Sequence, residues 1–369
     1  MQTEPGQAAV PELEIRGLRK LYGDYCAVDD LSLAVAKGEF ITILGASGSG
    51  KTTTLMMIAG FDYPTAGEIL FRGQTITFMP PHLRNIGMVF QSYALFPHLS
   101  VFDNIAFPLK LRRVGRAETK DRVAAALDLV RLAEHARKRP AQLSGGQQQR
   151  IALARALVFG PSLLLMDEPL GALDKSLREQ MQREIKRVQA ATGVTILSVT
   201  HDQDEALAMS DRIVVMDKGQ VEVVGTPLEI YEQPPNRMVA EFLKETNVLQ
   251  GRRAGSAEGE AHIHLPGGMA IRSAHAGVRS APPGATLMCC LRPERIRLAP
   301  ATAQTFGLPA RIRDKVYLGD IVKFHVVPEG TEIELVVKTL ASAETRLLTP
   351  GNAVRIAWND DDIQVFVHH

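Results

Sequence analysis

Short apolar runs alternate with amphipathic segments along residues 13–240. The clearest runs are Phe40–Leu44, Ser162–Met166 and Val194–Val199. Short, mainly apolar runs of this kind are typical of strands that are buried on both faces of a parallel sheet. Because helical patterns separate them, the chain is predicted to form an α/β layered domain with a largely parallel sheet.

Helical spacing follows the first of these runs. After Lys51 the apolar positions Leu55, Ile58 and Ala59 share one face, and Gly60 predicts the end of the helix. A second apolar stripe, interpreted as core packing, consists of Leu173, Leu177, Met181, Ile185 and Val188. A third face, formed by Val123, Leu127 and Val130, indicates a helical subdomain at about residues 92–155, inserted in the α/β core.

The pattern changes after residue 250. Gly, Ser and Ala become more frequent, and short segments such as 321–326 and 332–337 alternate between polar and apolar residues. A period of two over several short runs predicts a small antiparallel β domain, barrel-like in form. We therefore expect a disordered tail at 1–12, an α/β domain at 13–245 and a β domain at 246–369.

Residues 45–52 read Gly-Ala-Ser-Gly-Ser-Gly-Lys-Thr, a complete G-x-x-x-x-G-K-T loop between a predicted strand and a predicted helix. In such a loop backbone N–H groups surround a triphosphate, Lys51 reaches the β- and γ-phosphates and Thr52 holds Mg²⁺. The N-terminus of the following helix favours the same anion. The alternative, a Gly/Ser-rich turn without a ligand, does not explain this context.

Asp167 and Glu168 follow the apolar run that ends at Met166, so both carboxylates are expected at the carboxyl edge of a buried strand. Ligands bind at that edge in open α/β sheets. An Asp there can hold Mg²⁺ beside the P-loop Thr, and Glu168 is placed to deprotonate a water that attacks the γ-phosphate. The alternative is that the two residues simply cap the strand.

Three further side chains are candidates for this site. Gln91 follows the apolar run 87–90 and either completes the Mg²⁺ shell with its amide oxygen or is ordinary polar surface. His201 ends the run that begins at Val194 and either hydrogen-bonds the γ-phosphate or is structural. Tyr22 either stacks on adenine or packs on the core.

The charge balance restricts the classes of function. The 369 residues carry 42 Lys and Arg against 41 Asp and Glu, a net charge of +1 that provides no global footprint for nucleic acid. A basic run at 110–122 is interpreted as a solvated face rather than a surface for anionic lipid headgroups. Cys26, Cys289 and Cys290 have no metal-ligand or disulfide spacing, which fits a reducing compartment. The N-terminal residues lack a signal-peptide core and no segment has 18 consecutive apolar residues, so any membrane role is expected through a partner.

Taken in order and spacing, these motifs resemble the full motif set of ABC-type ATPases over about residues 13–240, together with Leu143-Ser144-Gly145-Gly146-Gln147 and Gly171-Ala172-Leu173-Asp174. The resemblance implies hydrolysis of ATP with Mg²⁺ by a head-to-tail homodimer. It assigns catalysis to Glu168, His201 and Gln91. It assigns Mg²⁺ to Thr52, Gln91 and Asp167. The implied nucleotide contacts are Tyr22, Gly45, Ala46, Ser47, Gly48, Ser49, Gly50, Lys51, Thr52 and Thr53 of one protomer and Ser144, Gly145, Gly146 and Gln147 of the other, with Asp174 on the dimer seam.

Other segments narrow the resemblance to importers. Gln91–His98 and Gly225–Pro227 look like ATPases that serve binding-protein-dependent uptake, and Leu291–Glu294 resembles an element of their C-terminal oligonucleotide-fold-like domain. Phe242–Asn247 and Pro80–Gly87 look most similar to spermidine/putrescine import ATPases, although Lys244 stands where that family commonly has Gly.

The importer resemblance implies a peripheral protein on the cytoplasmic face of the cell membrane. Its implied partners are integral membrane permease subunits, whose coupling helix would dock near Tyr93–His98, and a periplasmic or extracellular substrate-binding protein, with no nucleic acid. Iron, sulfate or sugar import stays open. A soluble ABC ATPase acting on nucleic acid or ribosomes would be favoured by tandem cassettes or a basic surface, and this chain has one cassette and a net charge of +1. A purely regulatory module is disfavoured by the intact Glu168 and His201.

Three remaining features have simple structural interpretations. His262 and His264 would share one face of a surface strand, without a third metal ligand. Cys289 and Cys290 would point to opposite faces of a strand, with one of them in the core. Asp360–Asp362 is expected to form an acidic turn between two strands.

Overall fold

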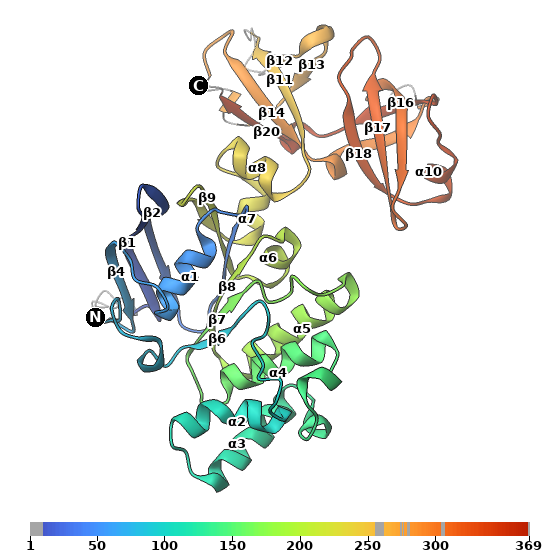
Figure 1. Ribbon diagram of the computed structural model, residues 1–369. Helices are drawn as coiled ribbons and strands as arrows, with labels where there is room; N and C mark the ends of the chain where they lie inside the picture. The colour runs from blue at the N-terminus through green and yellow to red at the C-terminus, as the bar shows by residue number, and fades with distance from the viewer. Residues whose placement is uncertain are drawn as a thin grey trace, which may run out of the picture. The chain divides into compact units, whose positions relative to one another are not determined.

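The computed structural model describes residues 10–254, 262–273, 275, 277–278, 281–303 and 307–367. Most of the tail expected at 1–12 therefore lies outside the described residues, although Glu12 is buried and pairs with Arg72 at 2.9 Å. The chain divides into two compact units, the first ending at Ile230 and the second beginning at Tyr231 (Figure 1).

A six-stranded sheet forms the centre of the first unit, in the order β10-β9-β3-β8-β7-β6. All neighbours are parallel except β9 and β10. Its strands are β3 (Phe40–Gly45), β6 (Gly87–Val89), β7 (Leu163–Asp167), β8 (Thr195–Thr200), β9 (Arg212–Asp217) and β10 (Gln220–Gly225). Every residue of β3, β7 and β8 is buried, as their apolar sequences predict.

A smaller antiparallel sheet has the order β2-β1-β4-β5. Its strands are β1 (Leu13–Tyr22), β2 (Tyr25–Val35), β4 (Ala66–Phe71) and β5 (Gln74–Thr75). Helix α1 (Lys51–Ala59) shares one apolar core with both sheets, to which β1, β3 and β8 contribute Leu13, Ile43 and Leu197. The helix ends at Gly60, whose φ of 83° closes the last turn, and this confirms the predicted stop.

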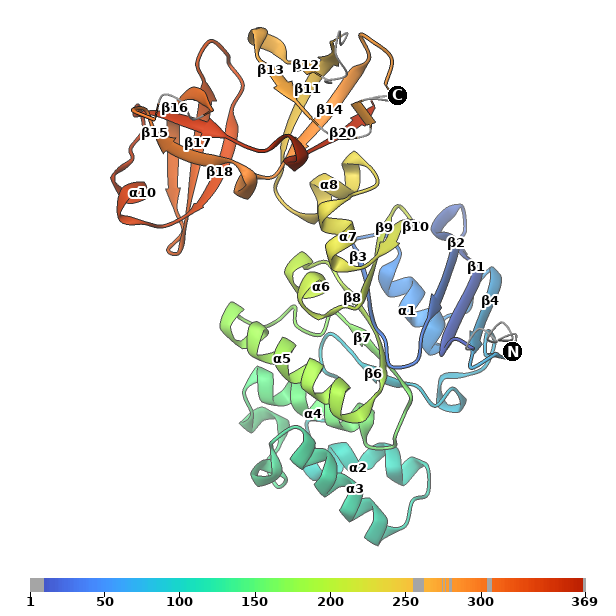
Figure 2. The same cartoon turned by 180° about the vertical axis from the view of Figure 1, so that it is seen from behind.

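Helices α2 (Val101–Leu111), α3 (Arg116–Leu129) and α4 (Gly145–Leu157) build a separate apolar core and group together in both views (Figures 1 and 2). The predicted face at Val123, Leu127 and Val130 is buried in that core. The remaining helices of the first unit are α5 (Lys175–Thr192), α6 (Gln203–Met209) and most of α7 (Pro227–Glu232). The stripe predicted on α5 is also confirmed, because Met181, Ile185 and Val188 pack against the central sheet.

The second unit holds helices α8 (Arg237–Leu243) and α10 (Ala343–Leu347) and two antiparallel five-stranded sheets, ordered β13-β12-β11-β14-β20 and β15-β19-β16-β17-β18. The strands of the first are β11 (Asn247–Arg253), β12 (His262–His264), β13 (Ala270–Arg272), β14 (Thr286–Leu291) and β20 (Ile363–Val367). Those of the second are β15 (Arg297–Pro300), β16 (Leu308–Tyr317), β17 (Ile321–Pro328), β18 (Leu335–Leu340) and β19 (Ala353–Ala357). One apolar core joins the two sheets, which agrees with the predicted antiparallel β domain.

The cysteine pair departs from expectation. Cys289 lies in the core, but Cys290 on the opposite face of β14 is also buried. Helix α8 contacts β14, and its residues Arg237 and Glu241 lie near the Cys290 thiol, so the helix covers the face that was expected to be open.

The two histidines and the acidic run lie where the sequence predicts. His262 and His264 are the ends of the short strand β12, and Asp360–Asp362 forms the predicted acidic turn between β19 and β20. Across the described residues, no three His, Cys, Asp or Glu side chains gather in a way that could hold a metal ion. In the same part of the chain, no helix has the length and apolar character needed to cross a membrane.

Candidate nucleotide-binding and hydrolysis site

The loop between β3 and α1 carries the P-loop sequence. Gly50 adopts a φ of 96° at the start of α1, and a Cβ there would lie 2.4 Å from the carbonyl oxygen of Ala27, so only glycine fits. The Lys51 ammonium is buried and donates to the carbonyl oxygens of Gly45 and Ala46, each at 2.8 Å. Burial lowers the pKa of Lys51. The carbonyl dipoles and the nearby carboxylates of Glu168 and Asp167 stabilise its charge, in a loop whose tip at Ala46–Gly48 is exposed.

Glu168 lies just beyond β7 and contacts two of the other candidates. Its Oε2 accepts a hydrogen bond from Nε2 of Gln91 at 3.2 Å, and its Oε1 lies 3.0 Å from Nδ1 of His201. Because β6, β7 and β8 are adjacent and parallel, the three residues that follow them meet at one edge of the sheet. The φ of Glu168 is 42°, an unusual value for a non-glycine residue that typically marks functional sites.

Asp167 ends β7 beside the P-loop. Its Oδ1 lies 3.4 Å from Oγ1 of Thr52, and its side chain is 8% exposed. Burial and, secondarily, the neighbouring carboxylate of Glu168 raise the pKa of Asp167. The Thr52 hydroxyl and the Asp167 carboxylate therefore lie together at the end of β7, and the attraction of the Lys51 ammonium does not outweigh the effect of burial on Asp167.

Tyr22 ends β1, and its ring is 50% exposed. The hydroxyl donates to Asp62, and this hydrogen bond is the main cause of the raised pKa of Tyr22. The ammonium of Lys20 lies 4.8 Å from the ring centre. The polar end of the side chain is thus held while a face of the ring is available for stacking.

The segment Ser144–Gln147 begins helix α4. Ser144 caps the helix, Gln147 completes a capping box with it, and the Gln147 amide also contacts His135 at 3.0 Å. Gly146 packs so closely that a Cβ would meet Leu177 at 2.7 Å. Among the described residues, none of these contacts joins the segment to the P-loop of the same chain. Ser144 and Gly145 are exposed, as is Asp174, which caps α5.

Two arginines near the site, Arg155 and Arg178, were not among the candidates predicted from the sequence. Arg155 of α4 donates to the carbonyl oxygens of Tyr93 and Ala94, both at 2.7 Å, in the loop after Gln91. Tyr93 and Ala94 have φ values of 61° and 47°, so this guanidinium holds a strained stretch. An arginine within the otherwise apolar run Ile151–Leu157 was the available signal. Arg178, which binds Asp202 at 2.6 Å, gave no such signal.

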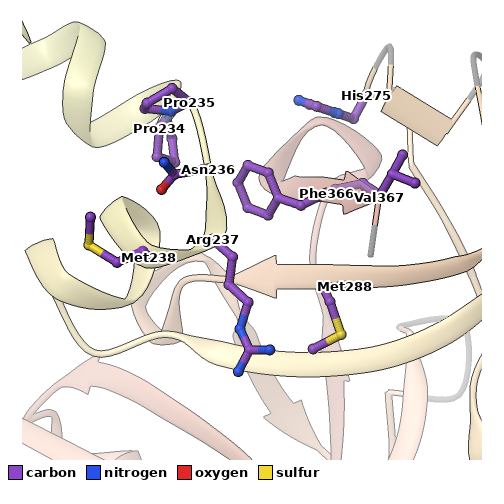
Figure 3. Close-up of a pocket in the computed structure, with 10 residues that line it drawn as sticks. Pro234, Pro235, Asn236, Arg237, Met238, His275, Met288, Phe366 and Val367 are labelled. Carbon is purple, nitrogen blue, oxygen red and sulfur yellow. The ribbon is translucent and has the colours of Figure 1, made fainter. Parts of the chain in front are cut away.

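A hollow of about 700 Å³ lies elsewhere, within the second unit (Figure 3). Phe366 of β20 points into it, and Met288, Arg237 and Pro234 contribute to its walls. His275 lies 6.5 Å from Phe366, ring centre to ring centre, and burial lowers the pKa of His275. No residue of the P-loop and none of the carboxylates beside it is among the described residues that line this hollow, so it shares no lining residue with the candidate site.

Two family models match the chain. The one described as ABC transporter covers residues 28–171, and the one described as TOBE domain covers residues 289–366. Three relatives are each called spermidine/putrescine import ATP-binding protein PotA. That of Rubrobacter xylanophilus is 47% identical, over 94% of this chain and 91% of its own length. Those of Acidothermus cellulolyticus (45%; 97% and 94%) and Pseudomonas aeruginosa (46%; 95% and 97%) are similarly close.

Two solved structures resemble part of this chain. CbiO1 from Clostridium perfringens, part of the ABC transporter complex cbiONQ, has a TM-score of 0.56 and 31% identity, covering 60% of this chain and 90% of that one. The ATP-binding cassette MJ0796, solved as a dimer in a post-hydrolysis state with ADP and Pi, has a TM-score of 0.52 and 33% identity, covering 58% and 98%. These agreements are consistent with the P-loop fold predicted from the sequence.

Proposed function

This chain belongs to the ATP-binding proteins of the ABC transporter family, and on that premise we propose that it drives the import of a polyamine, spermidine or putrescine. It is an ABC-type ATPase. The observation that carries the hydrolytic part is the position of Glu168, whose carboxylate lies between Gln91 and His201 beside the P-loop. The near full-length similarity to spermidine/putrescine import proteins supports the choice of substrate.

The residues around Asp167 fit a Mg²⁺ ion. Magnesium prefers oxygen ligands, and Thr52, Asp167 and the amide oxygen of Gln91 would supply them. Burial raises the pKa of Asp167, and a cation bound there would favour its ionised form. When bound, the ion would neutralise phosphate charge. We assign Thr52, Asp167 and Gln91 to this role.

Glu168 acts as the general base. It takes a proton from the water whose oxygen bonds to the γ-phosphorus as the bond to the β-phosphate oxygen breaks. Lys51 and the N–H groups of residues 45–53 bind the phosphates, and Tyr22 stacks on adenine. His201 holds Glu168 at 3.0 Å and hydrogen-bonds the γ-phosphate.

The site is completed by a second protomer. Ser144 and Gly145 are exposed at the N-terminus of a 13-residue helix, which favours an anion. Within the described part of the chain, their hydrogen bonds do not reach their own P-loop. We assign Ser144–Gln147 to the ATP held by the partner and Asp174 to the seam between the protomers. A lone monomer therefore holds an incomplete site.

A permease docks beside the loop that follows Gln91. Phe61, Tyr63 and Phe78 form a patch of exposed rings, between 43% and 72% exposed. The Tyr63 and Phe78 rings lie 5.9 Å apart, and the patch adjoins the loop because the Phe61 ring lies 5.9 Å from that of Phe90. Exposed apolar patches mark interaction sites. Together with Tyr93–His98, the patch would receive the permease and hold the protein at the cytoplasmic face of the membrane.

The test is ATP turnover by the assembled transporter in proteoliposomes, with the substrate-binding protein loaded from a panel. Putrescine or spermidine should stimulate turnover, whereas ferric iron, sulfate and sugars should not. Stimulation by one of those three alone would overturn the substrate and leave the hydrolytic site intact. Failure of the wild-type chain to hydrolyse ATP in any arm would overturn the assignment of the site.

A further inference from the structure

Arg178 connects the two segments that flank the proposed catalytic glutamate. Its Nη1 donates to Oδ2 of Asp202 at 2.6 Å, and its Nη2 donates to the carbonyl oxygen of Leu173 at 3.2 Å. Leu173 belongs to the segment that runs from Glu168 to the proposed seam residue Asp174. Asp202 directly follows His201. One side chain therefore fastens the seam segment to the histidine segment.

Asp202 is also fixed from its other side. It caps α6 by accepting a hydrogen bond from the backbone N–H of Glu205 at 3.0 Å, and its own N–H donates to Oγ1 of Thr200 at 3.0 Å. The Thr200 hydroxyl donates to Oε2 of the buried Glu205 at 3.1 Å. Both neighbours of His201 are thus held, whereas the His201 side chain is 58% exposed and contacts Glu168.

The backbone of Glu168 needs such support. A non-glycine φ of 42° persists only where surrounding contacts hold it. The N–H of Glu168 donates to the carbonyl oxygen of Val199 in β8. The carbonyl oxygen of Glu168 accepts from the N–H of Gly171 at 3.3 Å, and the Glu168 carboxylate contacts His201. The last two contacts come from the two segments that Arg178 joins.

We propose that Arg178 is a positioning residue for ATP hydrolysis. Its ion pair with Asp202 keeps His201 and Glu168 correctly placed relative to residues 171–174. The inference rests on the proposed function, because it concerns the same site. When a partner protomer contacts Asp174, any displacement of residues 171–174 reaches His201 through this pair. The ATP-binding loop at residues 45–53 makes no part of this connection.

The test is a double-mutant cycle in the full-length protein. Arg178→Gln removes the charge, and Asp202→Asn removes the ion pair while keeping a residue that caps helices equally well. Each variant should lower kcat about 10-fold with ATP affinity unchanged. The double variant should be no slower than either single variant, because both changes remove the same contact. Arg178→Lys, which keeps the charge, should recover most of the rate.

Arg187 provides the matched control. It lies farther along α5 and makes an equally short ion pair, 2.6 Å to the buried Glu184, with no connection to His201. Arg187→Gln should lower the thermal midpoint but leave kcat within about 2-fold. The inference is overturned if Arg178→Gln changes only the thermal midpoint, as is expected of Arg187→Gln. It is also overturned if the losses in kcat from Arg178→Gln and Asp202→Asn are additive in the double variant. Unimpaired hydrolysis by Glu168→Gln would refute the proposed site and this inference with it.

Discussion

The two units differ in where the backbone leaves its ordinary conformations. Within the described ranges, all non-glycine residues with positive φ lie in the first unit: Asp30, Arg72, Asn85, Tyr93, Ala94, Arg113, Arg131, Glu168 and Lys218. Three of them, Tyr93, Ala94 and Glu168, belong to the candidate site or the loop beside it. The other six lie outside the site, so a positive φ does not by itself mark function; the three at the site are held by specific contacts, and the second unit has no such residue in its described part.

Their charges are arranged differently as well. In the second unit Glu245 lies 2.7 Å from Lys323 and 3.0 Å from Lys338; burial opposes its ionisation, but the hydrogen bonds from the two lysines outweigh burial and lower its pKa. In the first unit burial raises the pKa of Asp167 and lowers that of Lys51. Ion pairs therefore dominate the pKa of Glu245, whereas burial dominates the pKa values of Asp167 and Lys51.

The largest effect is expected from Glu168→Gln. Glutamine keeps the size and can hydrogen-bond water but cannot accept its proton, so kcat should fall by about 10²–10⁴ while ATP affinity stays similar. Because ATP would join Lys51 of one protomer to Ser144 of the other, blocked hydrolysis should trap a dimer. Size-exclusion chromatography should show a dimer with Mg-ATP and a monomer or looser pair with ADP.

Ser144→Arg, added to that variant, is the control for closure. A bulky cation at the start of α4 should abolish the ATP-dependent dimer without altering the P-loop. An oligomeric state that ignores nucleotide, or a rate near that of the wild type, would contradict the two-protomer site.

The second comparison uses matched glycines. Gly50→Ala forces a φ of 96° on alanine and brings its Cβ to 2.4 Å from a backbone oxygen, so we expect a loss of roughly 3 kcal/mol or more in stability, with weaker ATP binding. Gly330→Ala has a φ of 79° but open space around it and should cost about 1 kcal/mol. Far-ultraviolet circular dichroism follows the helical first unit. Fluorescence of Trp358, the single tryptophan, follows the second. Equal losses of stability in the two variants would show that the backbone moves away from Ala27 without an energetic penalty.

The third comparison is the pH dependence of two glutamates. Burial, aided by Asp202 and Glu168, raises the pKa of Glu205 to about 8, against about 4.3 in an unfolded chain. The native protein therefore keeps a proton that the unfolded chain releases, and stability falls as pH rises from about 5 to 8. When the pH is raised from 6 to 8, the free energy of unfolding of the wild type should fall by about 1–3 kcal/mol more than that of Glu205→Gln, as measured by urea denaturation.

Glu245→Gln should behave in the opposite sense. Because the folded pKa of Glu245 is lowered, its contribution is present above about pH 4.3 and is lost as pH falls through the folded pKa. Below about pH 5, the free energy of unfolding of Glu245→Gln should depend less on pH than that of the wild type. Between pH 6 and 8, the two proteins should show the same pH dependence. Parallel curves for the wild type and Glu205→Gln would contradict a buried, protonated Glu205.

Local patterns explain what the sequence could predict. The P-loop lies between a strand and a helix that apolar spacing reveals, and Asp167 and Glu168 follow an apolar run directly, so the sheet edge collects them. Contacts between distant segments had no such pattern. The pairing of Arg178 with Asp202, 24 residues apart, and the burial of Cys290 under α8 depend on how finished elements pack. Arg155 lies between these cases, because a lone cation in an apolar helix indicates a buried partner but not which one.

The smallest effect should come from removing the second unit. All nucleotide motifs precede Ile230, so a chain truncated there should bind Mg-ATP with the affinity of the full chain, as measured by calorimetry, while dimer stability or regulation declines. Truncation after Gln250, beyond the boundary expected near residue 245, would keep α8 without Arg292, which donates to the carbonyl oxygens of Ala240 and Lys244 at 2.9 Å each. The longer chain should therefore have the lower thermal midpoint, because an apolar helix is left without its strand. Loss of ATP binding in a well-folded chain ending at Ile230 would mean that the second unit contributes to the site after all, and the contrast between the units would fail.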